Sequence, residues 1–229
     1  MKISRRLTQL LRPAWRRLRR RWSADRFLRR VQGVIHVGAN SGPERDDYAA
    51  LGLEVLWVEP IPEVFERLVE NIRPFPRQRA LMALVTDVDG RDYDFHVSSN
   101  HGASSSMLPL ARHRELWPHV DYASTLRITG TTLPTLLARE GIDPGRYQAL
   151  VLDTQGSELL VLRGASPILR GFQYVKAEVA DFESYAGCCL LPEMVSFMDE
   201  QGFRPISRTR FAGRTDVGNY YDVVFRRLA

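Results

Sequence analysis

The sequence predicts an α/β fold: a doubly wound, mainly parallel sheet covered by helices, with an antiparallel strand at one edge. Three observations predict this fold class. A short apolar run at 33–37 passes directly into a glycine-bracketed turn and then into a helix. Beyond it, apolar runs of strand length alternate with helical segments, which is typical of parallel sheets. The last two strand-like segments have no helix between them, so we expect them to pair as a hairpin.

The first half of the domain contains four of the expected strands and two longer helices. The strands are expected at 33–37, 54–58, 80–86 and, as an antiparallel partner, 92–97. The helices are expected at 43–51, which has a proline at its start, and at 63–72. The segment 99–125 is polar and is expected to be irregular, apart from a short helix around 108–116. A connection of this length in a compact domain usually carries function.

The second half continues the alternation. Helices are expected at 132–140, 157–163 and 191–201, and buried strands at 148–153 and 174–179. Glycines follow two of these helices, at Gly164 and Gly202, where they favour termination. The closing hairpin is expected at 204–210 and 220–226.

Basic residues are distributed unevenly along the chain of 229 residues. Residues 1–30 contain 12 lysines and arginines and one acid, whereas the remainder holds 20 basic and 26 acidic residues. We expect residues 1–30 to form a basic amphipathic helical arm and residues 31–229 to form one domain. The arm is suited to an anionic membrane surface, but docking on its own domain or on a partner is an open alternative. The acidic body argues against a nucleic-acid partner.

The cysteine pattern and the lack of long apolar runs bear on location. Cys188 and Cys189 are the two cysteines and are adjacent, so there is no disulfide framework. No apolar run approaches the roughly 18 residues needed to cross a bilayer, and no signal peptide is visible. We therefore expect a cytoplasmic protein, peripheral at the inner membrane surface if the arm binds lipid. The sequence gives no indication of an oligomeric state.

The turn after the first strand has the features of a nucleotide-binding site. Gly38 and Gly42 permit backbone conformations that other residues resist, and amides at the helix entrance favour an anionic group. Glu59 ends the second strand about 20 residues after the first glycine, where such folds place the acid that binds ribose hydroxyls. The spacing predicts an adenosine-type cofactor.

Six short segments follow one another in an order that is informative as a set. They are HVGANSG at 36–42, WVEP at 57–60, NHGASSS at 100–106, LDTQGSEL at 152–159, AEV at 177–179 and YDVVF at 221–225. Together they resemble the FkbM-type S-adenosylmethionine-dependent methyltransferases over roughly residues 31–229. The resemblance implies a Rossmann-like class I methyltransferase fold with seven strands, the last antiparallel, and S-adenosylmethionine as cofactor.

The resemblance also implies roles for particular residues. Gly38, Asn40 and Gly42 are expected to hold the methionine part of the cofactor, and Glu59 its ribose. Most such enzymes carry an acid where this chain has His36. His36 is therefore expected to be either a cofactor ligand or a buried strand residue whose ring is satisfied. Ser105, in the serine run 104–106, belongs either to a polar wall at the cofactor's carboxylate or to an ordinary loop.

The carboxyl end of the strand at 148–153 carries the main catalytic candidate. Asp153 lies where doubly wound sheets bind ligands. Its carboxylate can contact the cofactor's amine, take a hydroxyl proton or bind a metal, and the alternative is a helix N-cap. His101, in the long polar loop, is a second candidate general base, and His113 is a third.

Two further acids follow the neighbouring strand. Glu178 and Asp181 lie at its end, and adjacent parallel strands are about 4.8 Å apart. We therefore expect Asp153, Glu178 and Asp181 either to converge on one Mg²⁺ ion or to form a solvated acidic rim.

The expected reaction is methyl transfer from S-adenosylmethionine to a hydroxyl of a sugar, glycolipid or related metabolite, a small-molecule or glycan acceptor implied by the resemblance. Two other classes compete with it. An NAD-dependent oxidoreductase would normally have glycine where Asn40 stands. A non-catalytic, membrane-associated binding protein would not need the series Gly38, Glu59 and Asp153.

Overall fold

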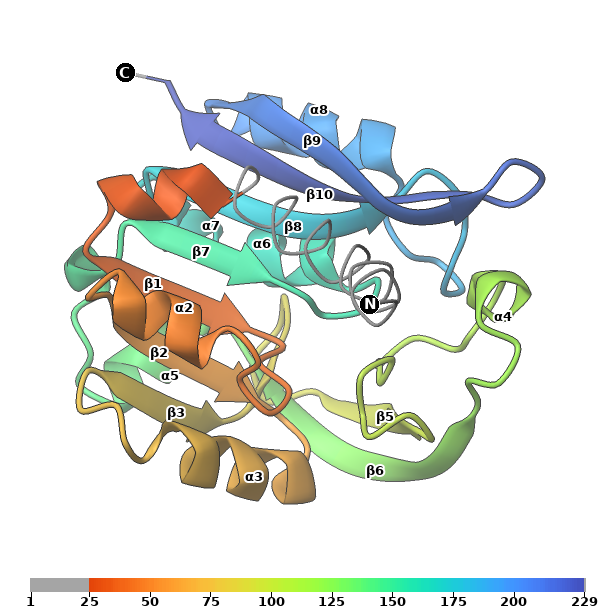
Figure 1. The fold of residues 1–229 in the computed structure, drawn as a ribbon, viewed down its shortest axis with the longest axis horizontal. Coiled ribbons are helices and arrows are strands. Elements are labelled where there is room, and N and C mark those ends of the chain that lie inside the picture. Colours follow the sequence, from red (N-terminus) through yellow and green to blue (C-terminus); the bar gives the residue numbers. More distant parts are fainter. Residues whose placement is uncertain (1–24, 229) are drawn as a thin grey trace, which may run out of the picture.

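The centre of the molecule is a seven-stranded sheet in the order β3-β2-β1-β7-β8-β10-β9 (Figure 1). The structure is a computed structural model, and it describes residues 25–228. The strands are β1 (Gly33–Val37), β2 (Glu54–Glu59), β3 (Gln78–Met82), β7 (Ala149–Leu152), β8 (Tyr174–Ala180), β9 (Phe203–Arg214) and β10 (Gly218–Arg227). The pairs from β3 to β8 are parallel, whereas β10 runs antiparallel to both β8 and β9. The predicted fold class and the closing hairpin are confirmed.

Helices cover both faces of this sheet. One face packs on α5 (Leu133–Arg139), α6 (Glu158–Gly164), α7 (Ser166–Leu169) and α8 (Leu191–Glu200). The other packs on a 3-10 helix, η1 (Asp25–Arg30), and on α2 (Arg45–Ala50) and α3 (Pro62–Ile72). In Figure 1, α2 lies in front of the sheet and α8 behind it. Successive residues of β1 enter opposite cores, which explains why its sequence is continuously apolar.

A second, three-stranded sheet stands beside the first. It contains β4 (Leu84–Val85), β5 (Asp92–Ser98) and β6 (Tyr122–Thr131) in the order β4-β6-β5. The predicted strand 80–86 is therefore divided between β3 and β4, which belong to different sheets. The antiparallel role predicted for 92–97 is confirmed, because β5 pairs with β6 in that sense.

Strand β6 begins at Tyr122, so the expectation that the chain is irregular up to residue 125 is wrong at its end. Polar side chains on β6 are largely exposed, while Leu126 and Ile128 pack against a small core that includes Phe95. The outer strand therefore lacks the apolar run by which strands of the main sheet were recognised. The short helix expected around 108–116 is α4 (His113–Leu116), and a 3-10 turn, η2 (Pro144–Arg146), precedes β7.

The end of the predicted basic arm packs against the domain. Phe27 and Leu28 of η1 are buried, and the carboxylate of Asp25 lies 2.9 Å from the ammonium of Lys176. The rest of the predicted arm, residues 1–24, lies outside the described residues. Between residues 25 and 228, no helix combines the length and the apolar character needed to cross a membrane.

Candidate functional site

The turn that leaves β1 forms one wall of a cavity of about 280 Å³ at the carboxyl ends of β1, β2 and β7. Gly38 has a φ of +81°, and a Cβ at this position would overlap the backbone carbonyl of Asp153. Gly42 has a φ of +69°, and a Cβ there would lie 2.8 Å from Leu68. Asn40 adopts a φ of +45° although it is not a glycine. This close-packed, strained turn explains why the sequence needs glycine at both positions.

Glu59 connects this turn to the start of α3. Its side chain is only 4% exposed; Oε2 accepts a hydrogen bond from the amide of Asn40 at 2.8 Å, and Oε1 from the amide of Ile61 at 3.0 Å. Burial raises the pKa of Glu59 to about 7, against the effect of these two bonds. A carboxylate oxygen can accept two hydrogen bonds, and each oxygen of Glu59 accepts one from these amides. One acceptor position on each oxygen is therefore left for ribose hydroxyls. Leu84 and Phe95 add apolar side chains to the cavity wall, so the lining offers acceptors for ribose hydroxyls and apolar surface for a base. This combination fits a nucleoside.

The turn that leaves β7 is held by a second buried carboxylate. Glu158 is 3% exposed and accepts bonds from the amides of Thr154 at 2.8 Å and Gly156 at 3.0 Å. Burial, and then the charge of Asp153, raises the pKa of Glu158 to about 7. The N-cap of α6 is Ser157, so Asp153 does not cap that helix. The alternative structural role considered for Asp153 is therefore removed.

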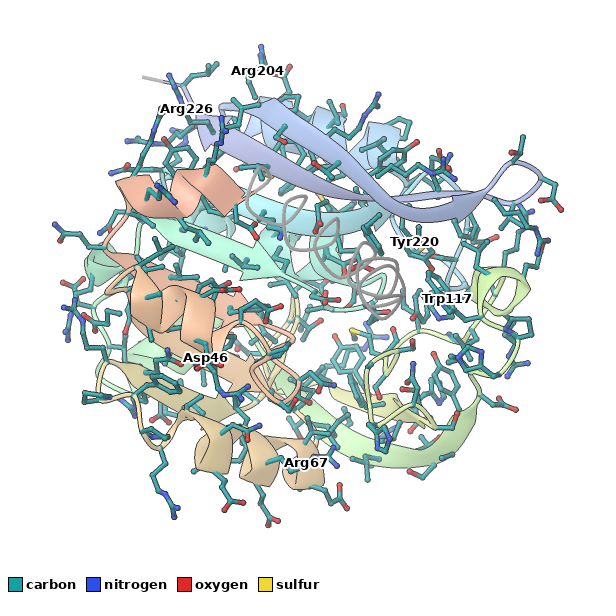
Figure 2. All side chains as sticks on the ribbon, viewed as in Figure 1. Asp46, Arg67, Trp117, Arg204, Tyr220 and Arg226 are labelled. Carbon is teal, nitrogen blue, oxygen red and sulfur yellow. The ribbon has the colours of Figure 1, made fainter. Side chains whose placement is uncertain are left out.

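Asp153 lines both the first cavity and a second one of about 540 Å³. The second cavity lies over β7, β8 and β10 and is rich in carboxylates and aromatic rings. Its lining includes His36, Tyr48, Trp117, Lys176, Glu178 and Asp222. Figure 2 shows Trp117 near Tyr220, and their ring centroids are 5.3 Å apart. Asp153 is thus the carboxylate at which the two cavities meet.

Glu178 is brought close to Asp153, as the strand order predicts. The side-chain amide of Gln155 donates to Asp153 Oδ1 at 2.5 Å and to Glu178 Oε1 at 3.3 Å. Burial, followed by the charges of Asp153 and Asp222, holds the pKa of Glu178 well above its usual range. The protonated form of Glu178 is therefore favoured beside Asp153.

Asp181 does not join these two acids. Its Oδ1 accepts from the amide of Asn219 at 2.7 Å, and its Oδ2 accepts from Asn219 Nδ2 and from the hydroxyl of Tyr221. These bonds turn the carboxylate toward β10. Within residues 25–228, no group of three histidine, cysteine, aspartate or glutamate side chains is arranged to hold a metal ion. The structure therefore does not assemble the predicted Mg²⁺ site of Asp153, Glu178 and Asp181.

The predicted histidines lie apart from the first cavity. The ring of His36 is buried, stacks on Trp57 with centroids 5.0 Å apart, and lies 3.2 Å from the hydroxyl of Tyr48 through Nδ1. His36 lines the second cavity and not the first. His113 is buried against Tyr220, and burial lowers its pKa to about 4.

The polar loop that carries His101 closes over the first cavity through its backbone. His101 has a φ of +60° and an exposed side chain, and its carbonyl accepts from Asn40 Nδ2 at 3.4 Å. Neither cavity lining includes its imidazole. Ser105 does line the first cavity, and its Oγ accepts from the amide of Ser98 at 2.9 Å. Of the serine run 104–106, Ser105 therefore lines the first cavity, and its hydroxyl also helps to hold the loop together.

Sequence reasoning gave no role to Gln155, Trp117, Lys176 or Asp222, although Gln155 and Asp222 lie inside quoted segments. The sequence signal that could have pointed to Gln155 is its position, two residues after Asp153 and directly before Gly156. The partners of Gln155 come from a neighbouring strand and a distant loop, so spacing alone could not identify them.

Comparison with known proteins agrees with this geometry. Residues 36–205 match the family model described as "Methyltransferase FkbM domain". The chain is 24% identical over 162 residues to the 2-O-methyltransferase NoeI of Sinorhizobium fredii, which covers 67% of this chain and about 65% of that protein.

Two solved structures show the fold alone. The METTL16 MTase domain superposes with a TM-score of 0.53 at 12% identity, over 93% of this chain and 68% of the other. An uncharacterized protein from Listeria monocytogenes serotype 4b gives a TM-score of 0.51 at 9% identity, over 90% and 66%. With the strand order and glycine turn above, the matches lead to one conclusion: this chain belongs to the FkbM methyltransferase domain family and has a class I methyltransferase fold.

Proposed function

We propose that this chain transfers the methyl group of S-adenosylmethionine to a hydroxyl oxygen of a sugar, glycolipid or related metabolite. The observation that carries the proposal is the position of Asp153, which lines both the first cavity and the larger cavity beside it. Family membership and a relative that carries the name 2-O-methyltransferase support this reaction class.

The first cavity is the proposed cofactor site. The turn from Gly38 to Gly42 brings backbone close to the ligand, and Glu59 binds the ribose hydroxyls. S-adenosylmethionine supplies a methyl group that is already activated by a sulfonium charge. The protein therefore contributes mainly alignment, which is worth about 7–11 kcal/mol in favourable cases.

The second cavity is the proposed acceptor site. Tyr48, Trp117 and Phe211 supply ring faces against which the apolar face of a sugar ring can pack. The carboxyl groups of Glu178 and Asp222 supply hydrogen-bonding partners for hydroxyls. Because carboxylates outnumber the single lysine in this lining, we expect a neutral acceptor rather than one with a phosphate beside the reacting hydroxyl.

Asp153 is the proposed general base. It takes the proton of the acceptor hydroxyl while the oxygen forms its bond to the methyl carbon and the carbon–sulfur bond breaks, leaving a neutral thioether. General-base catalysis of this kind typically accelerates a reaction by about 10²–10⁴-fold. We assign the base to Asp153 rather than His101 because Asp153 lines both cavities, whereas the imidazole of His101 lines neither.

A direct test uses radiolabelled S-adenosylmethionine with a panel of neutral methyl glycosides and their phosphorylated counterparts, in the presence of Mg²⁺ or of EDTA. The proposal is supported if a neutral glycoside is methylated by the wild type and the rate falls at least about 100-fold in Asp153→Asn. Asp46→Asn is the control, since Asp46 is 73% exposed on α2 and lines neither cavity (Figure 2). Unchanged turnover in Asp153→Asn would remove this carboxylate from the mechanism.

Calorimetric titration separates the alternatives. Binding of S-adenosylmethionine without binding of NAD supports methyl transfer, whereas binding of NAD alone would favour an oxidoreductase. Binding of neither would favour a non-catalytic protein.

For the arm, we propose peripheral contact with the inner membrane surface through residues 1–24, in an otherwise cytoplasmic protein. The uneven charge along the sequence supports this. Removing residues 1–24, while keeping the packed segment from Asp25, should abolish sedimentation with anionic vesicles and leave activity on a water-soluble acceptor intact. Sedimentation that persists would reject the membrane role.

A further inference from the structure

Gln155 occupies a strained position at the point where the two cavities meet. Its φ is +53°, and Asn40 and His101 are the other described non-glycine residues with a positive φ. The hydroxyl of Ser106 donates to the backbone carbonyl of Gln155 at 2.8 Å, and Gly156 follows with a φ of +99°. A left-handed conformation in a residue other than glycine costs about 1–3 kcal/mol and persists only where the surroundings fix it. The backbone of Gln155 is therefore held in place by the segment that carries Ser106.

The side chain of Gln155 is held at both ends as well. The hydroxyl of Tyr185, whose side chain is 1% exposed, donates to Gln155 Oε1 at 2.7 Å. Gln155 Nε2 donates to Asp153 Oδ1 and to Glu178 Oε1. This orientation of the amide follows from its neighbours, because a carboxylate accepts hydrogen bonds and the phenol has one to give.

We infer that Gln155 is a positioning residue for methyl transfer, an inference that rests on the function proposed above. Its amide donates to one oxygen of Asp153 and so fixes the orientation of the carboxylate that takes the proton of the acceptor hydroxyl. The same amide nitrogen also donates to Glu178, so each of the two acids accepts one of its N–H groups. Gln155 also lines the first cavity, but its side-chain amide bonds to the base rather than to the reacting atoms, and it acts through Asp153.

The surroundings of Asp153 define what its ionisation responds to. Titratable groups reach it or its two cavities from every neighbouring element: His36 from β1, Glu59 from β2, Glu158 from α6, Lys176 and Glu178 from β8, Tyr185 from the following loop, Asp222 from β10, Glu44 before α2 and Asp25 from η1. Most of these groups are acidic. The amide of Gln155 is a neutral donor among them, so replacing it with another acid changes the charge at the base directly.

The test compares Gln155→Met with Gln155→Glu in the full-length protein. Both replacements are unbranched at Cβ, so neither adds backbone strain beyond that of glutamine. Gln173→Met is the matched control, since Gln173 is exposed in the turn before β8. The measurements are the pH dependence of kcat on a neutral glycoside acceptor, KM for that acceptor, the calorimetric Kd for S-adenosylmethionine and the melting temperature.

We expect kcat at neutral pH to fall roughly 10- to 100-fold in Gln155→Met, with a smaller change in Kd for the cofactor because Gln155 also lines the first cavity. The acid limb of the pH profile should move upward in both variants because Asp153 loses a donor to its charged form, and by about one unit more in Gln155→Glu because of the added charge. Tyr185→Phe should give a smaller shift in the same direction.

A purely structural role would lower the melting temperature and leave the acid limb where it is. An unshifted limb in both Gln155 variants, or a kcat within about twofold of wild type, would overturn the inference. Failure of the proposed function is distinguishable, because wild-type protein would then bind no S-adenosylmethionine or methylate no acceptor. Should no acceptor be found, carboxyl ¹³C NMR titration of Asp153 gives the same comparison without turnover: an unchanged midpoint in Gln155→Met contradicts the inference.

Discussion

The turns that leave β1 and β7 are each held by a buried glutamate carboxylate, and they differ in what that carboxylate faces. In the β1 turn, the buried carboxylate of Glu59 accepts a hydrogen bond from the amide of Asn40 and a second from Ile61 at the start of α3. In the β7 turn, the buried carboxylate of Glu158 accepts hydrogen bonds from the amides of Thr154 and Gly156. Burial raises the pKa of both to about 7. Glu59 lines the first cavity, whereas Glu158 lines neither cavity and supports the turn that carries Asp153. A buried carboxylate of the same kind therefore lies once in a cavity wall and once behind a turn.

The largest expected effect comes from crowding the β1 turn. In Gly38→Ala the new Cβ meets the carbonyl of Asp153, so the two turns are forced apart. We expect a loss of at least about 3 kcal/mol in the free energy of unfolding, together with loss of cofactor binding. Gly52→Ala is the matched control: its φ of +68° carries the same backbone cost, about 1 kcal/mol, but its Cβ meets nothing. Equal losses in urea denaturation would show that the turns are not packed against each other.

The second prediction separates ligand contact from scaffold. Glu59→Gln should raise Kd for S-adenosylmethionine roughly 10- to 100-fold, because a charged acceptor for ribose hydroxyls is removed. Glu158→Gln should change this Kd by less than about threefold, yet lower the free energy of unfolding by about 1–2 kcal/mol. Calorimetry and urea denaturation on both variants give the comparison. If Kd for S-adenosylmethionine changes equally in both variants, Glu59 holds its turn in place, as Glu158 does, without binding the cofactor.

The third prediction concerns pH. Because Glu59 and Glu158 have raised pKa values in the folded protein, the folded state keeps protons that the unfolded chain has already released near its ordinary value of 4.5. Stability must therefore fall as pH rises through about 7. The lowered pKa of His113 has the opposite effect, confined mainly to pH below 6.5.

The raised pKa of Glu178 acts in the same direction as those of Glu59 and Glu158. Between pH 6.5 and 8 we accordingly expect the free energy of unfolding to fall by at least about 1 kcal/mol in wild type, with a shallower slope in Glu158→Gln. Urea denaturation at several pH values measures both slopes. A stability that rises over this range would contradict the protonation states assigned to the two carboxyl groups.

The smallest effect is expected at Asp181. Asp181→Asn replaces one of two acceptor oxygens with an NH2 group, so part of the bonding to Asn219 and Tyr221 is lost and unfolding should become easier by about 1 kcal/mol. Because Asp181 lines neither cavity, kcat should stay within about twofold of wild type. The effect on kcat should be the same with Mg²⁺ as with EDTA. A large fall in kcat that is specific to Mg²⁺ would restore Asp181 as a metal ligand.

The same comparison shows what sequence can and cannot predict. The β1 turn and Glu59 were predicted because every feature lies on one local stretch of strand, glycines, helix and next strand. Strand β6 was missed because it covers a small outer core and leaves most of its side chains exposed. Asp181 was placed with Asp153 because distance from a strand end says nothing about which way a side chain turns. Gln155 had no assigned role because its partners meet only in the folded chain.

The central claim is that a nucleoside cofactor and an acceptor occupy two cavities that meet at Asp153. A crystal structure of the protein with S-adenosylhomocysteine and a neutral methyl glycoside tests it most directly. We predict ribose hydroxyls within hydrogen-bond distance of Glu59, and a glycoside hydroxyl beside Asp153 on the side of Trp117 and Glu178. The claim is contradicted if the nucleoside lies outside the Gly38–Gly42 turn, or if Asp153 contacts neither ligand.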